Sequence, residues 1–520
     1  MEKSKNRKVT VDVSTSMTEV TGSIYLVNIQ FTNGTKINIL IDCGKESYSD
    51  EVEPFPGFFF NPSNLDAVFI THPHLDHYGR LGELVHEGLN PLCKIYCTKG
   101  AEAILPLALT NSYTVDLSKY KKKEMPYDRN DVDEVISILC GEDYNTNIVI
   151  EKTTGFKVIV TPLYNAHLPG ACSYLVRVID KNDSTDNIFI FSGDYKEHSA
   201  LCVEKKIPKE IFKLPVNVFI ESTYGARSEN DVTMSFMEKV LQSVYQGKKV
   251  LIPSISLERF QLILLILRNA QLSGALSTKI PIFADAPLGV NYSKIMQHDD
   301  RIELRPECKN FEPENLTIGS RLSTSIDGPA IFVTGGGMGH GPSQSYISRV
   351  LNDPTFVILF TCYQAENSIG RKVIDAEYGE EIIIQGTPCI KKAEVCWTGE
   401  FSGHSHQEGL LRFLEKFKHL QSVAITHGDE ENRIGLERAI EEKYPDLKVM
   451  NFEKTHYFKY QENELKATPL SKLVSVTKTF DEIKAQKEEF ARKRKHREKT
   501  GTVRPSYSFK NFVDNITPKK

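Results

Sequence analysis

Apolar, β-branched runs of strand length recur along the chain, and most of them stop at a polar residue. KINILID stops at an acid, FKVIVTPLYNAH at a histidine and NIFIFSGD at an acid. Runs of this length and composition predict strands. Seven strand-like segments carry acidic residues or histidines near their ends, namely Asp42, residues 72–77, His167, Asp194, Glu221, His404 and His427. Because strand ends are where α/β and β-sandwich scaffolds gather functional side chains, the pattern predicts one shared site.

The pattern changes between about residues 225 and 385. KKVLIPSIS is typical of a buried strand, LERFQLILLILRNAQ predicts a helix, and IPIFADAPLG and PAIFVTGGGMG predict further strands with glycine or proline turns. Alternating strands and helices indicate an α/β domain with a parallel sheet. Since metal-type residues lie on both sides of it, we expect this domain to be an insertion. The predicted divisions are 1–222 and 386–465 for the first domain, 223–385 for the inserted domain and 466–520 for a tail.

Charge is distributed unevenly along the chain. Residues 471–520 hold fourteen Lys or Arg and six Asp or Glu, whereas the whole chain carries −4, so the remainder carries −12. A basic tail on an acidic body suits a polyanionic partner, although many such tails are only solvated. Nucleic-acid contact by residues 484–499, the segment KAQKEEFARKRKHREK, is therefore a hypothesis.

The remaining composition is that of an ordinary globular protein. No apolar run approaches the roughly 20 residues that span a bilayer, and the start of the chain lacks the apolar stretch of a secretory signal. The ten cysteines include no C-x-x-C pair, which favours free thiols in a reducing compartment. We expect a cytoplasmic protein without a membrane partner, and a homodimer is one candidate assembly.

The segment HPHLDH at 72–77 is the strongest chemical signal. An extended backbone after a strand puts alternate residues on one side, so His72 and His74 converge. Asp76 and His77 then enter a helix-like segment and face the same cavity. Imidazole and carboxylate suit Zn²⁺, although other divalent ions accept the same mixed set. These residues cannot complete two metal sites, so distant ligands are needed. His167 and Asp194 are the natural candidates, since each closes a strand.

The order of Asp42, H-x-H-x-D-H, His167 and Asp194 resembles the motifs of the metallo-β-lactamase superfamily. ESTYG at 221–225, FSGHS at 401–405 and ITHGD at 425–429 resemble motifs A, B and C of its β-CASP nucleases. TEVTGSIYLV, LIDCG and YQAENSIGRK are similar to the stand-alone, RNA-degrading type. The resemblance covers about residues 15–460. It implies an αββα sandwich with an inserted β-CASP domain, followed by the basic tail.

The resemblance also implies two Zn²⁺ ions and a role for each matching residue. One ion would be held by His72, His74 and His167, and the second by Asp76, His77 and His427. Asp194 would bridge them, and Asp42 would steady the site from outside. Asp76, Asp194, Glu221 and His404 would be catalytic, with Glu221 orienting His404 as general acid. Substrate contacts are expected from Ser402, Arg259, Arg371 and Gly337.

The histidine at motif C, His427, is similar to RNA-processing members, so the expected activity is a zinc-dependent ribonuclease, most simply endonucleolytic. A 5′-to-3′ exonuclease, a DNA nuclease, a lactonase or thioesterase, and a non-catalytic RNA-binding subunit remain alternatives. Three positions depart from the family pattern. His406 stands where an Asp is usual, Glu258 where a glycine is common, and the loop at 334–341 reads TGGGMGHG. These departures leave every predicted metal ligand in place.

Overall fold

The computed structural model describes residues 8–15, 22–45, 57–120, 125–229, 234–320, 323–364, 368–451, 456–461 and 464–469. Most of the predicted tail, from residue 470 onward and including 484–499, lies outside these ranges. Among the described residues no helix combines the length and apolar character needed to cross a membrane.

The chain forms two compact units. The first comprises residues 1–198, 204–228 and 404–520, and the second comprises 199–203 and 229–403. This division differs from the predicted one at 223–385 because strand β19 (Glu394–Trp397) pairs with β16 (Phe356–Phe360) inside the second unit. The predicted start of the tail at 466 also falls within a strand, β23 (Glu464–Pro469).

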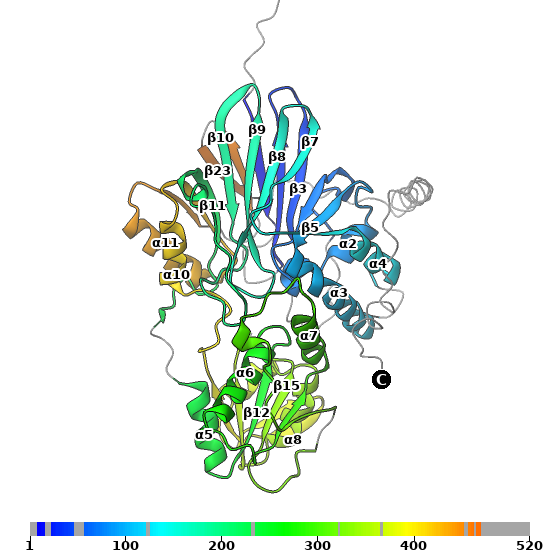
Figure 1. The fold of residues 1–520 in the computed structure, drawn as a ribbon, viewed down its shortest axis with the longest axis vertical. Coiled ribbons are helices and arrows are strands. Elements are labelled where there is room, and N and C mark those ends of the chain that lie inside the picture. The colour runs from blue at the N-terminus through cyan, green and yellow to red at the C-terminus, as the bar shows by residue number, and fades with distance from the viewer. Residues whose placement is uncertain are drawn as a thin grey trace, which may run out of the picture. The chain divides into compact units, whose positions relative to one another are not determined.

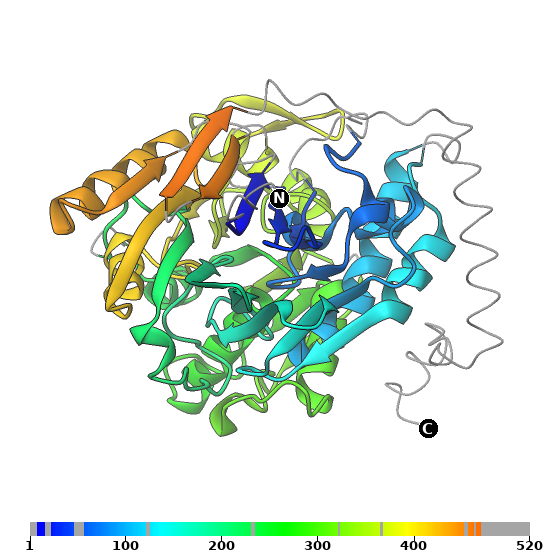
Figure 2. The same cartoon turned by 90° about the horizontal axis from the view of Figure 1, so that it is seen from above.

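The first unit contains two sheets (Figures 1 and 2). The eight-stranded sheet has the order β23-β22-β1-β2-β3-β4-β5-β6, and the seven-stranded sheet has the order β21-β20-β11-β10-β9-β8-β7. The strands of the first sheet, besides β23, are β22 (His456–Gln461), β1 (Thr10–Thr15), β2 (Ile24–Gln30), β3 (Lys36–Cys43), β4 (Ala67–Phe69), β5 (Lys94–Thr98) and β6 (Leu139–Glu142). Those of the second are β21 (Lys448–Asn451), β20 (His419–Thr426), β11 (Pro215–Glu221), β10 (Asp183–Phe191), β9 (Cys172–Asp180), β8 (Phe156–Tyr164) and β7 (Ile148–Thr153).

Successive side chains of a strand point to opposite faces of the sheet, and this alternation builds the sandwich. In β10, Phe189 and Phe191 enter the core between the sheets, whereas Ile188 and Ile190 join the core on the other face. That outer face is covered by α10 (Gln407–Glu415) and α11 (Glu430–Lys443). Helices α1 (Leu75–Tyr78), α2 (Leu81–His86), α3 (Lys99–Lys119) and α4 (Arg129–Ile138) accompany the first sheet. Because side chains alternate with period two, one strand supplies both cores, which gives the predicted αββα layers.

The second unit is an α/β domain around a six-stranded sheet in the order β14-β13-β15-β12-β16-β19. Every pairing in this sheet is parallel, as the alternation of strands and helices predicted. Its remaining strands are β12 (Lys249–Ser254), β13 (Ile282–Asp285), β14 (Leu316–Ile318) and β15 (Ile331–Gly335). A separate two-stranded sheet is formed by β17 (Glu381–Ile384) and β18 (Thr387–Ile390). Figure 1 shows β12 and β15 between helices. These are α5 (Phe236–Tyr245), α6 (Arg259–Leu272), α7 (Pro287–His298), α8 (Pro342–Val350) and α9 (Ile369–Asp375).

Candidate metal centre

Four polar strand ends of the first unit lie at one edge of its second sheet. Strands β10, β11 and β20 run parallel to one another, so their carboxyl ends are adjacent. Asp194 follows β10, Glu221 ends β11 and His427 follows β20. His167 follows β8, which is antiparallel to β9 and therefore runs in the direction of β10. Sheet topology alone brings together residues more than two hundred positions apart.

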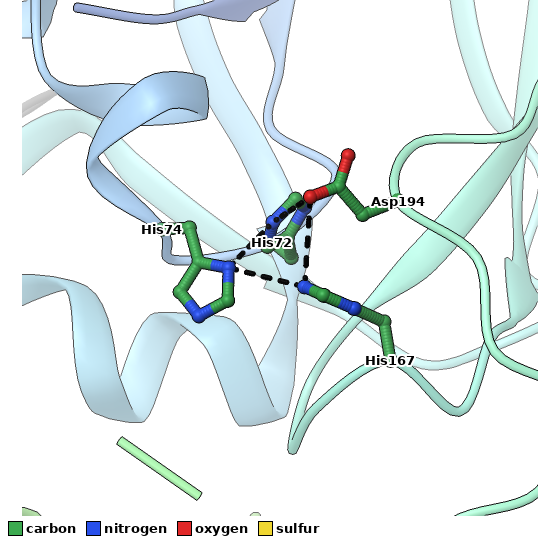
Figure 3. A group of neighbouring side chains, drawn as sticks. All are labelled: His72, His74, His167 and Asp194. Carbon is green, nitrogen blue, oxygen red and sulfur yellow. Dashed lines mark hydrogen bonds and ion pairs between the residues drawn. The ribbon is translucent and has the colours of Figure 1, made fainter. Parts of the chain in front are cut away.

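The first group of side chains consists of His72, His74, His167 and Asp194 (Figure 3). Nδ1 of His74 lies 3.2 Å from Nε2 of His72 and 3.0 Å from Nε2 of His167. Oδ2 of Asp194 lies 3.4 Å from Nε2 of His72 and 3.6 Å from Nε2 of His167. Nitrogen and oxygen atoms converge on one point from three separate loops.

The second group consists of Asp76, His77, Asp194 and His427. Nε2 of His77 lies 3.2 Å from Oδ1 of Asp194 and 3.9 Å from Oδ2 of Asp76. Nε2 of His427 lies 3.6 Å from Oδ2 of Asp76. Asp194 therefore divides its carboxylate, with Oδ2 in the first group and Oδ1 in the second, which is the geometry of a bridging ligand.

Buried atoms without hydrogen bonds test whether a cation fits here. Nε2 of His77, Oδ1 of Asp194 and Nε2 of His427 are buried and, within the described part of the chain, have ion-pair contacts but no hydrogen bond of ordinary geometry. Leaving one such atom unsatisfied costs about 1–3 kcal/mol. All three belong to the second group, and a cation bound among them satisfies all three at once. The donor set fits a divalent metal ion.

Hydrogen bonds behind the ligand atoms fix which ring nitrogen carries the proton. Oδ2 of Asp42 lies 2.7 Å from Nδ1 of His77. The Thr71 hydroxyl lies 2.8 Å from the same Oδ2 and 3.0 Å from Nδ1 of His72. With the hydroxyl donating to the carboxylate and accepting from His72, Nδ1 carries the proton in the neutral form of both imidazoles, and Nε2 is the nitrogen that faces the other candidate ligands. Asp42 therefore lies behind His72 and His77, and its role in steadying a metal site stays a prediction.

Three further residues of this arrangement were not recognised in the sequence. Besides Thr71, the hydroxyl of Thr223 lies 3.2 Å from Nδ1 of His427. The Asn165 amide donates to the carbonyl of Asp194 at 2.6 Å and accepts from the backbone N–H of His167 at 2.9 Å, which ties the two loops together. Each lies within four residues of a candidate ligand or of Glu221, but neutral polar residues are too common there to be a signal.

The pKa values differ between the two groups. Burial lowers the pKa of His72 to about 3 and that of His74 to about 4, and it holds the pKa of His167 well below its usual value. Burial opposes protonation of His77 as well, but the carboxylates of Asp194, Asp42 and Asp76 outweigh it and raise its pKa well above the usual value. A cation entering the second group must displace protons, so its uptake releases them.

His404 lies beside the first group and is held by Glu221. Its Nδ1 is 2.9 Å from Oε1 of Glu221, and its Nε2 is 3.8 Å from Oδ2 of Asp194. Glu221 is itself fixed by backbone N–H groups of Tyr195 and Thr223, at 2.7 and 3.0 Å. Burial acts to lower the pKa of His404, but Glu221 and then Asp194 raise it to about 9. The His404 side chain is 16% exposed and Asp76 is 14% exposed, so solvent reaches the centre from this side.

The four residues expected to contact substrate have internal roles in the second unit or are only partly exposed. The buried guanidinium of Arg259 donates to the carbonyl of Thr361 and lies over the Phe401 ring. Arg371 pairs with Asp375 on the next turn of α9. A β-carbon on Gly337 would meet the sulfur of Cys362 at 2.8 Å, so the glycine permits close packing. Ser402 is half-buried in the same unit.

Two departures from the family pattern have clear local geometry. The His406 ring stacks on Tyr224, with centroids 5.4 Å apart and planes 16° from parallel. Glu258 has φ +65° and ψ −54°, and the N–H of Arg259 donates to the carbonyl of Leu257 at 2.8 Å. This is a γ-turn with positive φ, which is strained for any residue with a side chain. A glycine is the residue that accommodates it best.

Comparison with known proteins gives three family matches in chain order. Residues 17–180 match the metallo-beta-lactamase superfamily, residues 260–373 match the Beta-Casp domain, and residues 391–450 match the Zn-dependent metallo-hydrolase RNA specificity domain. A ribonuclease of Thermus thermophilus is 26% identical over 84% of this chain and 96% of its own length. A probable RNase of Methanocaldococcus jannaschii is 27% identical over 76% of this chain and 88% of its own. The transcription termination factor FttA of Methanococcus maripaludis is 27% identical over 76% of this chain, which covers 64% of that factor.

Proposed function

Because the chain belongs to the β-CASP group of the metallo-β-lactamase superfamily, we propose that it is a two-zinc ribonuclease that cuts RNA internally. The observation that carries the proposal is the divided carboxylate of Asp194, which faces three histidines with one oxygen and two histidines with the other. Ribonucleases among the relatives, and the match to an RNA specificity domain, support RNA as the substrate.

The donor types support zinc. Each group offers imidazole nitrogens together with carboxylate oxygens, the ligands that Zn²⁺ takes in hydrolytic sites. The second group, which includes Asp76, would hold one ion. The first group, which includes His74, would hold the other. Zinc ions bound there would activate a water molecule and neutralise charge on the phosphoryl oxygens.

The protein's own contribution to the reaction is proton transfer. Hydrolysis forms a bond from a water oxygen to phosphorus, with loss of a proton from that water, and breaks the bond to the leaving ribose oxygen, which must gain a proton. His404 is the general acid of this proposal, because Glu221 binds its Nδ1 and leaves Nε2 directed towards Asp194. The Glu221 carboxylate favours the protonated form of His404, and with Asp194 it raises the pKa of His404 to about 9 in the metal-free protein. General acids of this kind contribute about 10²–10⁴-fold.

Two variants separate the roles of metal binding and proton donation. His74→Ala removes a candidate ligand, so we expect zinc content to fall and cleavage to be lost. His404→Ala should slow cleavage by about 10²–10⁴-fold with near-normal zinc content. His198→Ala is the matched control, because this histidine is 75% exposed and pairs only with Glu204 among the described ion pairs. Loss of zinc in His404→Ala would contradict the assignment of His404 as a proton donor.

The mode of cutting is tested with the wild-type protein, zinc and 5′-end-labelled RNA. Internal cutting gives labelled fragments of many lengths at early times. Release of labelled mononucleotide alone would instead establish a 5′-to-3′ exonuclease. Omitting zinc, or adding a chelator, should abolish all products.

A further inference from the structure

The chain's single tryptophan, Trp397, is partly exposed at the end of strand β19 in the second unit. It is 39% exposed, and its Nε1–H donates to the carbonyl of Cys362 at 2.8 Å. The same carbonyl accepts from the buried amide of Gln364 at 2.9 Å. The polar atom of the indole is therefore satisfied internally, and the ring is held in place before any ligand arrives.

Other exposed side chains lie at the same edge of the sheet. Tyr363 follows β16 and is 45% exposed, and Ile255 follows β12 and is 36% exposed. Strands β12, β16 and β19 are parallel neighbours, so their carboxyl ends meet at one edge. Gly337 joins the group from the loop after β15, since a β-carbon at this position would meet Cys362 at 2.8 Å and Ile255 at 3.0 Å. Large exposed aromatic side chains in one place usually mark a binding surface.

Electrostatics at this edge favours an anionic partner. Helix α6 begins at Arg259 after β12, and helix α8 begins at Pro342 after β15, so both amino-terminal ends face the carboxyl edge of the sheet. The amino terminus of a helix carries partial positive charge, which attracts phosphate. A partner that combines flat apolar rings with a polyanionic backbone matches both properties. Single-stranded nucleic acid has that chemistry.

We propose that Trp397 and Tyr363 form a stacking site for the unpaired bases of single-stranded RNA. The site deepens the proposed function, on which it rests, by assigning a place where the substrate's bases are held. Because every base has an aromatic face, such a site binds RNA with little sequence preference. The fixed indole loses little conformational freedom on binding, which increases its contribution to affinity.

The solitary tryptophan makes the test direct. Wild-type protein is treated with a chelator to prevent cleavage and titrated with oligouridylate about 12 nucleotides long, and with an abasic oligomer of equal charge. We expect oligouridylate to quench the tryptophan fluorescence and the abasic oligomer to leave it unchanged. In fluorescence anisotropy with labelled oligouridylate, Trp397→Ala and Tyr363→Ala should each weaken binding about tenfold, with abasic binding unaffected.

Tyr245→Ala is the matched control, because Tyr245 is 61% exposed in the same unit and ends α5 just before β12 begins, at the opposite edge of the sheet. The affinity of Tyr245→Ala for oligouridylate should equal that of wild type.

Unchanged tryptophan fluorescence at saturation overturns the stacking site, as does wild-type affinity in both Trp397→Ala and Tyr363→Ala. If wild type still cleaves RNA, the proposed function survives either result, whereas absence of cleavage by wild type overturns that function itself. Circular dichroism melts confirm that the variants are folded.

Discussion

Replacing Thr71 with valine tests whether a hydroxyl outside the candidate metal ligands controls metal binding. Valine has the shape of threonine, so the buried volume is preserved. The change replaces the hydroxyl with a methyl group. The hydroxyl contacts both oxygens of Asp42, at 3.0 and 2.8 Å, Nδ1 of His72, at 3.0 Å, and Nδ1 of His77, at 3.4 Å. The backbone N–H at position 71 still donates to Asp42 at 2.7 Å, so the loop keeps its anchor.

The expected magnitude follows from these bonds. In Thr71→Val, the Nδ1–H of His72 loses its acceptor in a fully buried position, and Asp42 loses a donor. A hydrogen bond to a charged group contributes about 1.5–3 kcal/mol, and an unsatisfied buried donor costs about 1–3 kcal/mol. A net loss of about 2 kcal/mol in the metal-bound state lowers zinc affinity about 30-fold. Changes to such supporting hydrogen bonds typically cost 10–100-fold in affinity.

Zinc affinity is measured by competition with a coloured chelator, with Thr71→Ser as the matched variant. Serine keeps the hydroxyl, so its zinc affinity should stay within about threefold of wild type. Thermal melts followed by circular dichroism show whether each variant is folded. A folded Thr71→Val protein that binds zinc as tightly as Thr71→Ser would refute the role assigned to the hydroxyl.

Two further predictions concern backbone geometry. A β-carbon on Gly44 would overlap the carbonyl oxygen of Asp76 and come within 2.7 Å of the Ser23 nitrogen, so Gly44→Ala should displace Asp76. We expect destabilisation of about 1–3 kcal/mol and zinc stoichiometry nearer one than two. Gly335→Ala, whose nearest neighbour would be 3.4 Å away, is the control, and retention of both ions by Gly44→Ala would contradict the reasoning. Glu258→Gly should relieve the strained γ-turn. Part of this gain is offset by the larger conformational entropy that glycine loses on folding, so we expect the free energy of unfolding to rise by about 1 kcal/mol. Thermal unfolding checks this, and a lower melting temperature would count against it.

Local chemistry made much of this protein predictable. The αββα layers follow from period-two alternation in runs such as residues 187–191, because a strand with apolar residues on both faces must lie between two cores. The parallel sheet of the second unit follows from strands alternating with helices. The HPHLDH segment predicted a metal site by itself, because so dense a set of imidazoles and carboxylates is rare without a cation. Each of these signals is carried by neighbouring residues.

Tertiary structure decided what depends on atoms from distant segments. Strand β19 belongs to the second unit because its partner β16 lies there, whereas the pattern along the sequence put the end of the inserted domain at 385. Arg259 has a buried partner, the carbonyl of Thr361, and Arg371 has a surface partner, Asp375, and neither could be inferred from the charge of the arginine. The division of Asp194 between two groups, and the Thr71 hydroxyl behind His72, depend on separations of a few ångströms. The sequence determined which functional groups were present and roughly at which strand ends, but only the packing of two sheets fixed their directions, because hydrogen bonding and coordination depend on distance and angle.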